Sequence, residues 1–258
     1  MKITVLTENT GINESLITEH GLSLYIETEA YKILFDMGQT DAFIKNAEKL
    51  NIKLENVDFA VLSHGHYDHG GGLKNFFDIN KDAPIYIHKL AFEPHFNGSE
   101  KYIGLDTSLQ NNPRIIFTED FFKINENISL YSCNDKKLNF QLDFSGLNKV
   151  ENGELMPDEF LHEQYMLIEE KGKKILISGC SHKGILNITH WFDAEVIIGG
   201  FHFSKFPLDD TLKNYAIHLN TTNAEFFTCH CTGVEQYKFM KNHMNKLSYI
   251  STGMTIEI

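Results

Sequence analysis

The sequence has almost no arginine and little positive charge. Arg114 is the only arginine in 258 residues, and 23 Lys and Arg stand against 35 Asp and Glu, which gives a formal net charge of −12. This charge disfavours broad electrostatic binding to nucleic acid or to an anionic membrane surface, so we expect neither as a partner. We expect a small-molecule substrate instead. Any phosphate on it must be held by lysine, histidine, backbone N–H groups or a metal.

Long apolar runs and a disulfide framework are also missing. No stretch of about 18 apolar residues predicts a membrane span, and the first residues lack the apolar core and cleavage site of a signal peptide. The cysteines are few and are not spaced like a disulfide framework: Cys133, Cys180, Cys229 and Cys231. We therefore predict a cytoplasmic protein. The sequence carries no signal for its oligomeric state.

The chain is long enough for one large mixed domain. Hydrophobic residues make up 42% of it, and no linker rich in Pro, Gly or Ser divides it. Strands are expected at 22–27, 31–35, 58–62, 84–88, 164–169, 174–178, 195–198 and 225–229, and helices at 40–51, 208–219 and 234–243. This order predicts an α/β (α+β) chain, a single domain over 1–258, in which two sheets pack together with helices outside. The turn-rich stretch of about 90–158 is expected to be an irregular segment that shapes a substrate pocket.

One short segment contains most of the candidate metal ligands. Residues 63–69 read Ser-His-Gly-His-Tyr-Asp-His and follow the apolar run 59–62, which predicts a buried strand. Side chains on a loop at a strand end can converge on one point, and imidazole nitrogens with a carboxylate suit zinc, iron or manganese. Water bound to such an ion ionises near neutral pH and becomes a nucleophile. We predict that one divalent ion is held by His64 and His66 and a second by Asp68 and His69, with Asp68 also orienting the nucleophile.

Two later segments offer further ligands at strand ends. Cys180-Ser181-His182 follows a predicted strand, and His230 lies between a strand and a helix. We predict His182 and His230 as metal ligands. For Cys180 two roles remain open: a thiolate ligand, or a buried core cysteine. The second alternative goes with Ser181 as the N-cap of the next helix. Two neighbours of His230 are instead expected in the core: Cys229 and Cys231.

Three more polar residues are candidates for the same site. His162 precedes a predicted strand and is either a further ligand or a residue that positions one. Asp36 ends the predicted hairpin, where a carboxylate can accept the second N–H of a ligand histidine; a simple Asx-turn is the alternative. His202 follows two glycines that allow close approach of the backbone. We predict that His202 lines the substrate pocket and binds an anion or acts as an acid.

Together these motifs resemble those of the metallo-β-lactamase-fold hydrolases. The likeness is carried first by residues 33–38 (Ile-Leu-Phe-Asp-Met-Gly) and 62–73 (Leu-Ser-His-Gly-His-Tyr-Asp-His-Gly-Gly-Gly-Leu). Later segments are similar to the subfamily of 7,8-dihydropterin-6-methyl-4-(β-D-ribofuranosyl)-aminobenzene 5'-phosphate synthase: 179–185 (Gly-Cys-Ser-His-Lys-Gly-Ile), 199–202 (Gly-Gly-Phe-His) and 230–233 (His-Cys-Thr-Gly). The likeness covers nearly the whole chain.

The resemblance implies a four-layer αββα sandwich with one or two divalent metal ions at one edge of the two sheets. Zinc is the first expectation, with iron or manganese as alternatives. The resemblance also implies metal binding by the histidines and the aspartate of residues 64–69, and His230 matches the last family histidine. One departure concerns Cys180, because dinuclear hydrolases of this fold usually place a bridging aspartate at the end of that strand.

These observations predict a metal-dependent hydrolase or transferase acting on a small phosphorylated or heterocyclic substrate, which the subfamily suggests is a pterin. In hydrolysis, activated water attacks a carbonyl carbon or a phosphorus. In transfer, metal holds a pyrophosphate leaving group while an aryl amine attacks a pterin methylene. Two alternatives remain open: a phosphodiesterase or nuclease of the same fold, and a metal-containing ligand-binding protein without turnover. The single arginine and the net charge count against a nuclease.

Overall fold

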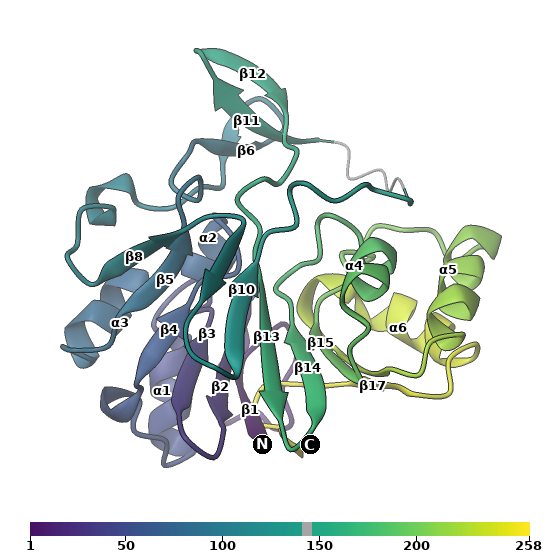
Figure 1. Cartoon of the computed structure of the whole chain (residues 1–258), viewed down its shortest axis with the longest axis horizontal. Coiled ribbons are helices and arrows are strands. Elements are labelled where there is room, and N and C mark those ends of the chain that lie inside the picture. Colours follow the sequence, from purple (N-terminus) through teal and green to yellow (C-terminus); the bar gives the residue numbers. More distant parts are fainter. Residues whose placement is uncertain (141–145) are drawn as a thin grey trace.

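Two seven-stranded sheets stack face to face in the computed structural model, which describes residues 1–140 and 146–258 (Figure 1). The strand order is β18-β1-β2-β3-β4-β5-β8 in the first sheet and β17-β16-β15-β14-β13-β10-β9 in the second. Helices cover the outer face of each sheet. The αββα sandwich expected from the sequence is therefore confirmed.

The first sheet carries helices α1 (Ala42–Lys49) and α3 (Leu73–Ile79) on its outer face, and the short helix α2 (Tyr67–Gly70) lies at its edge. Phe43 of α1 and Phe76 of α3 pack there against Leu34 and Ala60. Its strands are β1 (Lys2–Thr7), β2 (Ser23–Glu27), β3 (Lys32–Phe35), β4 (Phe59–Val61), β5 (Ile85–His88), β8 (Ile115–Thr118) and β18 (Thr255–Glu257).

The second sheet carries helices α4 (Ile185–Phe192), α5 (Asp210–Asn220) and α6 (Val234–Lys241). None of the helices in the described part of the chain has the length and apolarity needed to cross a bilayer. The strands of this sheet are β9 (Phe121–Lys123), β10 (Ile128–Tyr131), β13 (Tyr165–Glu170), β14 (Lys173–Ile177), β15 (Val196–Gly199), β16 (Glu225–Thr228) and β17 (Leu247–Tyr249).

Central strands bury both faces because successive side chains point to opposite sides of a sheet. Leu24 and Ile26 of β2 lie in the core between the sheets, whereas Tyr25 packs under the helices of the first sheet. Ile175 of β14 enters the same central core, and Leu176 faces the helices of the second sheet. Double burial explains why the sequence shows continuous apolar runs there rather than alternation.

The stretch of about 90–158 is more regular than the sequence indicated. It supplies β8 to the first sheet and β9 and β10 to the second, and its remaining strands form a small third sheet that projects from the sandwich (Figure 1). That sheet contains β6 (His95–Asn97), β7 (Lys101–Tyr102), β11 (Leu147–Glu151) and β12 (Glu154–Pro157). These strands are only two to five residues long, so turn residues dominate the pattern. Positions 141–145 of the predicted segment lie outside the described residues.

Helix α4 does not begin at Ser181. Its N-cap is Gly184, while the hydroxyl oxygen of Ser181 lies 2.8 Å from that of Ser178. The expectation that Ser181 caps this helix is therefore wrong. The hydroxyl instead closes the turn at the end of β14, so residues 178–183 form a loop from which His182 projects.

Gln164 joins the two sheets at the end of β4. Its Nε2 donates to the carbonyl oxygens of Leu62 (2.8 Å) and Tyr86 (3.2 Å), and its Oε1 accepts from Thr118 Oγ1 (2.7 Å). Its backbone N–H donates to the carbonyl oxygen of Ser63 (2.8 Å). Gln164 is fully buried, so its amide satisfies polar groups that lie out of reach of bulk water.

Replacing Gln164 with Ala is expected to lower the free energy of unfolding by about 2–4 kcal/mol, because it leaves several buried groups without partners. Denaturant unfolding followed by circular dichroism measures the change. The matched control is Gln110→Ala, at an exposed position, which we expect to change the unfolding free energy by less than about 0.5 kcal/mol. Equal effects of the two substitutions would show that Gln164 does not join the sheets in solution.

Candidate metal centre

Three histidines converge beyond the ends of β4 and β14. His64 and His66 lie on the loop between β4 and α2, and His182 lies on the loop between β14 and α4. The Nε2 atoms of His64 and His182 are 3.3 Å apart, and ligand atoms of all three residues lie within 4.8 Å of one another. Ligand nitrogens of a tetrahedral zinc site, with Zn–N bonds of about 2.0–2.1 Å, lie about 3.3 Å apart. These residues, which we call the three-histidine set, can therefore hold one ion.

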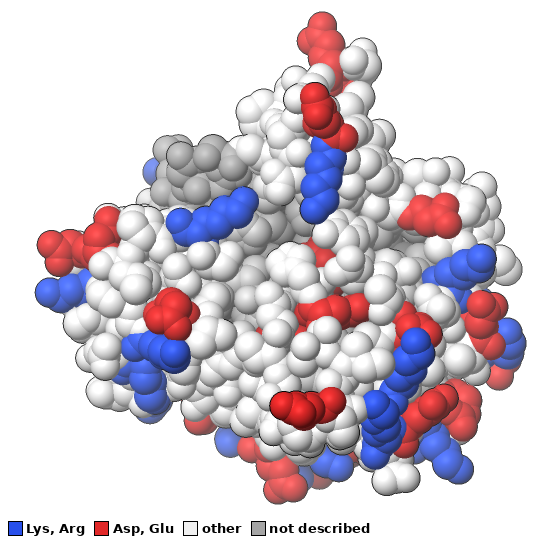
Figure 2. All heavy atoms as spheres, turned by 180° about the vertical axis from the view of Figure 1, so that it is seen from behind, with Lys and Arg blue, Asp and Glu red and all other residues white. Residues whose placement is uncertain are grey.

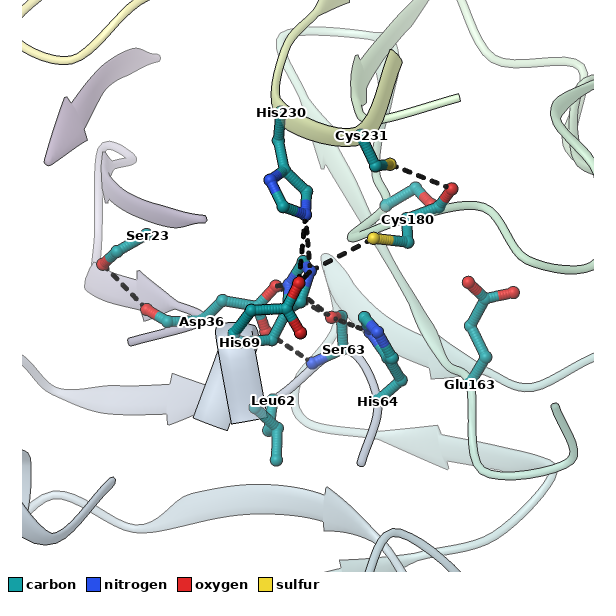
Figure 3. A network of polar contacts seen from close by, with 12 residues as sticks. Ser23, Asp36, Leu62, Ser63, His64, His69, Glu163, Cys180, His230 and Cys231 are labelled. Atoms are coloured by element: carbon teal, nitrogen blue, oxygen red, sulfur yellow. Dashed lines mark hydrogen bonds and ion pairs between the residues drawn. The ribbon is translucent and has the colours of Figure 1, made fainter. Parts of the chain in front are cut away.

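A second set lies beside the first and contains Asp68, His69 and His230. Figure 3 shows His230 pointing toward His69, with Cys180 on the same side. His69 Nε2 is 3.2 Å from His230 Nε2, and His230 Nε2 is 3.5 Å from Asp68 Oδ2. Cys180 Sγ lies 3.1 Å from His69 Nε2, and the same thiol groups with His69 and His64 within 4.8 Å. Cys180 thus lies between the two sets, where a bridging ligand would be placed.

Asp36 contacts His69 from the side away from Cys180. Its Oδ2 is 2.6 Å from His69 Nδ1 and accepts from Ser63 Oγ (2.8 Å), and its Oδ1 accepts from the Ser63 N–H (2.7 Å). The carboxylate therefore binds Ser63 and His69 across the site, unlike the local contact of an Asx-turn. It fixes a proton of His69 on Nδ1, so Nε2 is the nitrogen left to bind a metal. Because the pKa of His69 is raised to about 9, Nε2 is protonated as well without metal, and a bound ion would replace that proton. That metal role remains a prediction.

Burial keeps the three-histidine set neutral. It lowers the pKa values of His64, His66 and His182 well below the ordinary value, and neighbouring imidazoles lower them further. Neutral imidazole is the form that binds metal. Nε2 of His66 is buried and has no hydrogen-bond partner among the described residues, so a cation there would satisfy a group that otherwise lacks one.

The second set carries charge. Burial alone would lower the pKa of His69, but Asp36 and Asp68 outweigh it and raise the pKa to about 9. Burial opposes ionisation of Asp68, yet His69, His20 and His230 hold its pKa well below the ordinary value. Asp68 is thus a carboxylate, the form that binds a divalent ion.

His162 and His202 lie on different sides of the three-histidine set. His162 Nδ1 accepts the N–H of Gly65 (2.9 Å), and its Nε2 lies 3.3 Å from Asp158 Oδ2. The ring centroid of His202 lies 4.3 Å from that of His182. His202 therefore lies next to the predicted ligand His182, whereas the contacts of His162 are with protein groups.

Sequence reasoning missed several residues of the site. The sequence gives no signal for His20, yet its Nε2 is 3.2 Å from Asp68 Oδ2. Cys231 was expected in the core, and it is buried, but it also groups with Cys180 and His202 within 4.8 Å. No local pattern marks either one. His20 comes from a loop far from residues 63–69 in sequence. For Cys231, the one available signal is its position just after a strand, which would place it at the same edge of the sheet as the other ligands.

A cavity of about 470 Å³ opens above the two sets. One wall carries Asn97, Lys101, Ile103 and Leu147, from the stretch predicted to shape the pocket, and another carries residues 204–207 after β15. The candidate residues that line it are His66, Asp68, Cys180, His182, His202 and His230. A ligand in this cavity therefore contacts both sets.

Residues 17–213 match the metallo-beta-lactamase superfamily. The chain belongs to this superfamily. It is 29% identical, over 100% of its length and 96% of the relative, to 7,8-dihydropterin-6-methyl-4-(beta-D-ribofuranosyl)-aminobenzene-5'-phosphate synthase of Methanocaldococcus jannaschii. It is 30% identical to the solved structure of Tm1679, a metal-dependent hydrolase of the beta-lactamase superfamily, with a TM-score of 0.86 and coverage of 100% and 99% of the two chains. Zn²⁺-bound PqqB of Methylobacterium extorquens, 10% identical with a TM-score of 0.58 and full coverage of both chains, shares the fold.

Replacing His66 with Ala is expected to weaken metal binding by more than about 100-fold, because even residues that only orient ligands contribute about 10–100-fold. Elemental analysis after dialysis against a graded chelator measures the loss. His190→Ala, an exposed histidine on α4, is the control and should retain wild-type metal content. Wild-type stoichiometry in His66→Ala would remove His66 from the ligand set.

The role of Cys180 as a thiolate ligand can be tested by absorption spectroscopy. In protein loaded with Co²⁺, a thiolate ligand gives a charge-transfer band that carboxylate and imidazole ligands do not give. We expect this band in the wild type and its loss in Cys180→Asp, which should keep the wild-type number of ions. Cys133→Ser, at a buried cysteine outside both sets, is the control. A wild-type spectrum without the band would assign Cys180 to the core.

Proposed function

We propose that the protein is a metal-dependent enzyme that acts on a small phosphorylated substrate bound in the 470 Å³ cavity. The observation that carries this proposal is the meeting of two potential ligand sets at the base of one cavity that also carries lysines. Superfamily membership supports metal dependence, and the full-length likeness to a synthase with a phosphorylated product supports the substrate class.

The donor chemistry fits two divalent ions. Neutral imidazoles form one set. A carboxylate with two imidazoles forms the other, with a thiol between them. Such donors suit zinc first, and iron or manganese as alternatives. When bound, these ions would stabilise negative charge on a leaving group or lower the pKa of water.

The positive charge at the cavity favours an anionic substrate. Lys101 of β7 and Lys205 after β15 both line it, and Lys101 Nζ lies 5.6 Å from the ring centroid of Tyr67. Arg114 is engaged elsewhere, since its Nη1 donates to the carbonyl oxygen of Asn80 (2.7 Å). On the face seen in Figure 2, Lys and Arg are interspersed with Asp and Glu. The charge of the ligand is therefore expected to complement the lysines that line the cavity rather than the net charge of −12.

Group transfer is the reaction we place first. In it, an aryl amine nitrogen forms a bond to a pterin methylene carbon while the bond from that carbon to pyrophosphate breaks, and the amine loses a proton. Asp68, fixed by His20 at 3.2 Å, would hold the second ion close to the departing group. His202, beside His182, is placed to donate to a departing phosphate oxygen. Hydrolysis through activated water uses the same residues and is the second reaction to test.

A substrate panel distinguishes these reactions. It contains a dihydropterin methyl pyrophosphate with an aminobenzene ribosyl phosphate, a set of phosphodiesters, and a set of lactones. We expect turnover of the pterin pair by wild-type protein and its loss, by at least about 100-fold, in Asp68→Ala. Diester or lactone turnover without transfer would replace the synthase reaction by hydrolysis. Tight binding without any turnover would favour a ligand-binding protein.

Lysine substitutions test the substrate charge. Lys101→Ala and Lys205→Ala are each expected to raise KM for the phosphorylated substrate by about 10- to 150-fold, because a charged hydrogen bond contributes about 1.5–3 kcal/mol, with a smaller change in kcat. The control is Lys213→Ala, on the exposed surface of α5, which should leave both constants unchanged. An unchanged KM in both cavity variants would contradict phosphate binding by these lysines.

A further inference from the structure

A buried cluster of polar side chains lies beside the candidate metal centre. His95, Asp158 and His162 group with His66, with ligand atoms within 4.8 Å of one another. By composition these four could hold a cation of their own. The hydrogen-bond donors around them favour another role.

The Gly65 amide fixes the proton on His162. A backbone N–H can only donate, and that of Gly65 donates to His162 Nδ1 over 2.9 Å. Nδ1 is therefore the acceptor of the ring, and Nε2 must carry the hydrogen. That hydrogen is directed at Asp158 Oδ2, 3.3 Å away. In this form His162 has no lone pair at Nε2 for a metal, so it is a donor to Asp158 rather than a ligand.

Asp158 also accepts hydrogen bonds from two further N–H groups. His95 Nδ1 lies 2.8 Å from the same Oδ2, and the N–H of Phe160 donates to Oδ1 over 2.7 Å. Burial alone would raise the pKa of Asp158, but the hydrogen bonds from His162 and His95 outweigh it and lower the pKa below its ordinary value. An ionised carboxylate with three N–H donors is a strong anchor for the two rings.

The cluster connects two parts of the molecule. His95 belongs to β6 and Asp158 directly follows β12, so both lie at the base of the third sheet. Gly65 lies between His64 and His66, and a Cβ at this position would come within 2.2 Å of the carbonyl oxygen of Ala91. The loop is thus held by His162 and packed closely against residue 91. A change in the hydrogen bond at Gly65 would move both neighbouring histidines.

We propose that His95, Asp158 and His162 are positioning residues that fix the backbone of the His64–His66 loop and connect it to the third sheet, which also carries Lys101 of the cavity wall. This inference rests on the proposed metal centre, because positioning matters only if the loop binds an ion. The connected path runs from His95 through Asp158 and His162 to the Gly65 amide.

Substitution at His162 tests the path with and without metal. His162→Phe keeps a ring but removes the acceptor, and His162→Gln keeps an acceptor for Gly65. In metal-free protein, we expect amide exchange at Gly65, measured by NMR, to be at least about tenfold faster in the Phe variant and nearer the wild-type rate in the Gln variant. In Co²⁺-loaded protein, we expect His162→Phe to weaken binding by about 10–100-fold and to change the ligand-field bands. His243→Phe, near the surface after α6, is the control.

If His162→Phe does not fold, Asp158→Asn supplies the same comparison. The asparagine NH₂ group replaces one carboxylate oxygen, so an N–H donor would then face the N–H donors that Asp158 now accepts. Wild-type exchange at Gly65 together with wild-type Co²⁺ affinity and spectrum in the folded variants would overturn the proposal. So would an additional bound ion that is lost in His95→Ala, because the cluster would then be a cation site. Failure of wild-type protein to bind any ion would instead refute the proposed function, and the exchange at Gly65 would still show whether the path exists.

Discussion

The structure depends on burying many polar side chains at one edge of two stacked sheets. Six candidate ligands are each at most 8% exposed: His64, His66, Asp68, His69, His182 and His230. Moving such groups out of water is unfavourable unless each finds a partner, and for an ionised group the cost is large. The fold meets this constraint in two ways. Hydrogen bonds satisfy Nδ1 of His64, His69 and His230. The ligand atoms that face one another are left to bind a cation.

Two buried carboxylates, Asp36 and Glu163, form hydrogen bonds with the loops that carry the ligands. Asp36 holds His69 and the Ser63 backbone of the first sheet. Glu163, from the segment entering the second sheet, accepts the N–H groups of His182 (2.7 Å) and Lys183 (3.1 Å). Each sheet therefore carries a buried carboxylate that fixes the position of the loop with its ligands. The two loops meet correctly only when the sheets stack in register, which links the central apolar core to the geometry of the centre.

The sequence predicted the parts of this arrangement that local pattern encodes. Apolar runs marked the central strands, and the dense motif at 63–69 marked the main loop, because both signals lie within a few residues. The pairing of His20 with Asp68 was beyond local pattern, because the two residues are 48 positions apart and meet only after folding. The third sheet was missed for a related reason. Its strands are short and pair across a long separation, as in the contact of His95 with Lys149.

Cys180 is where the chain departs from its superfamily pattern, and its surroundings narrow the choice of metal. Burial raises the pKa of this thiol, so it is protonated in the metal-free protein and becomes a thiolate only when an ion replaces the proton. Hard ions such as magnesium and calcium prefer oxygen donors and gain little from sulfur, whereas zinc and iron accept sulfur together with imidazole. With its sulfur 3.1 Å from His69 Nε2, Cys180 would as a ligand favour these softer ions.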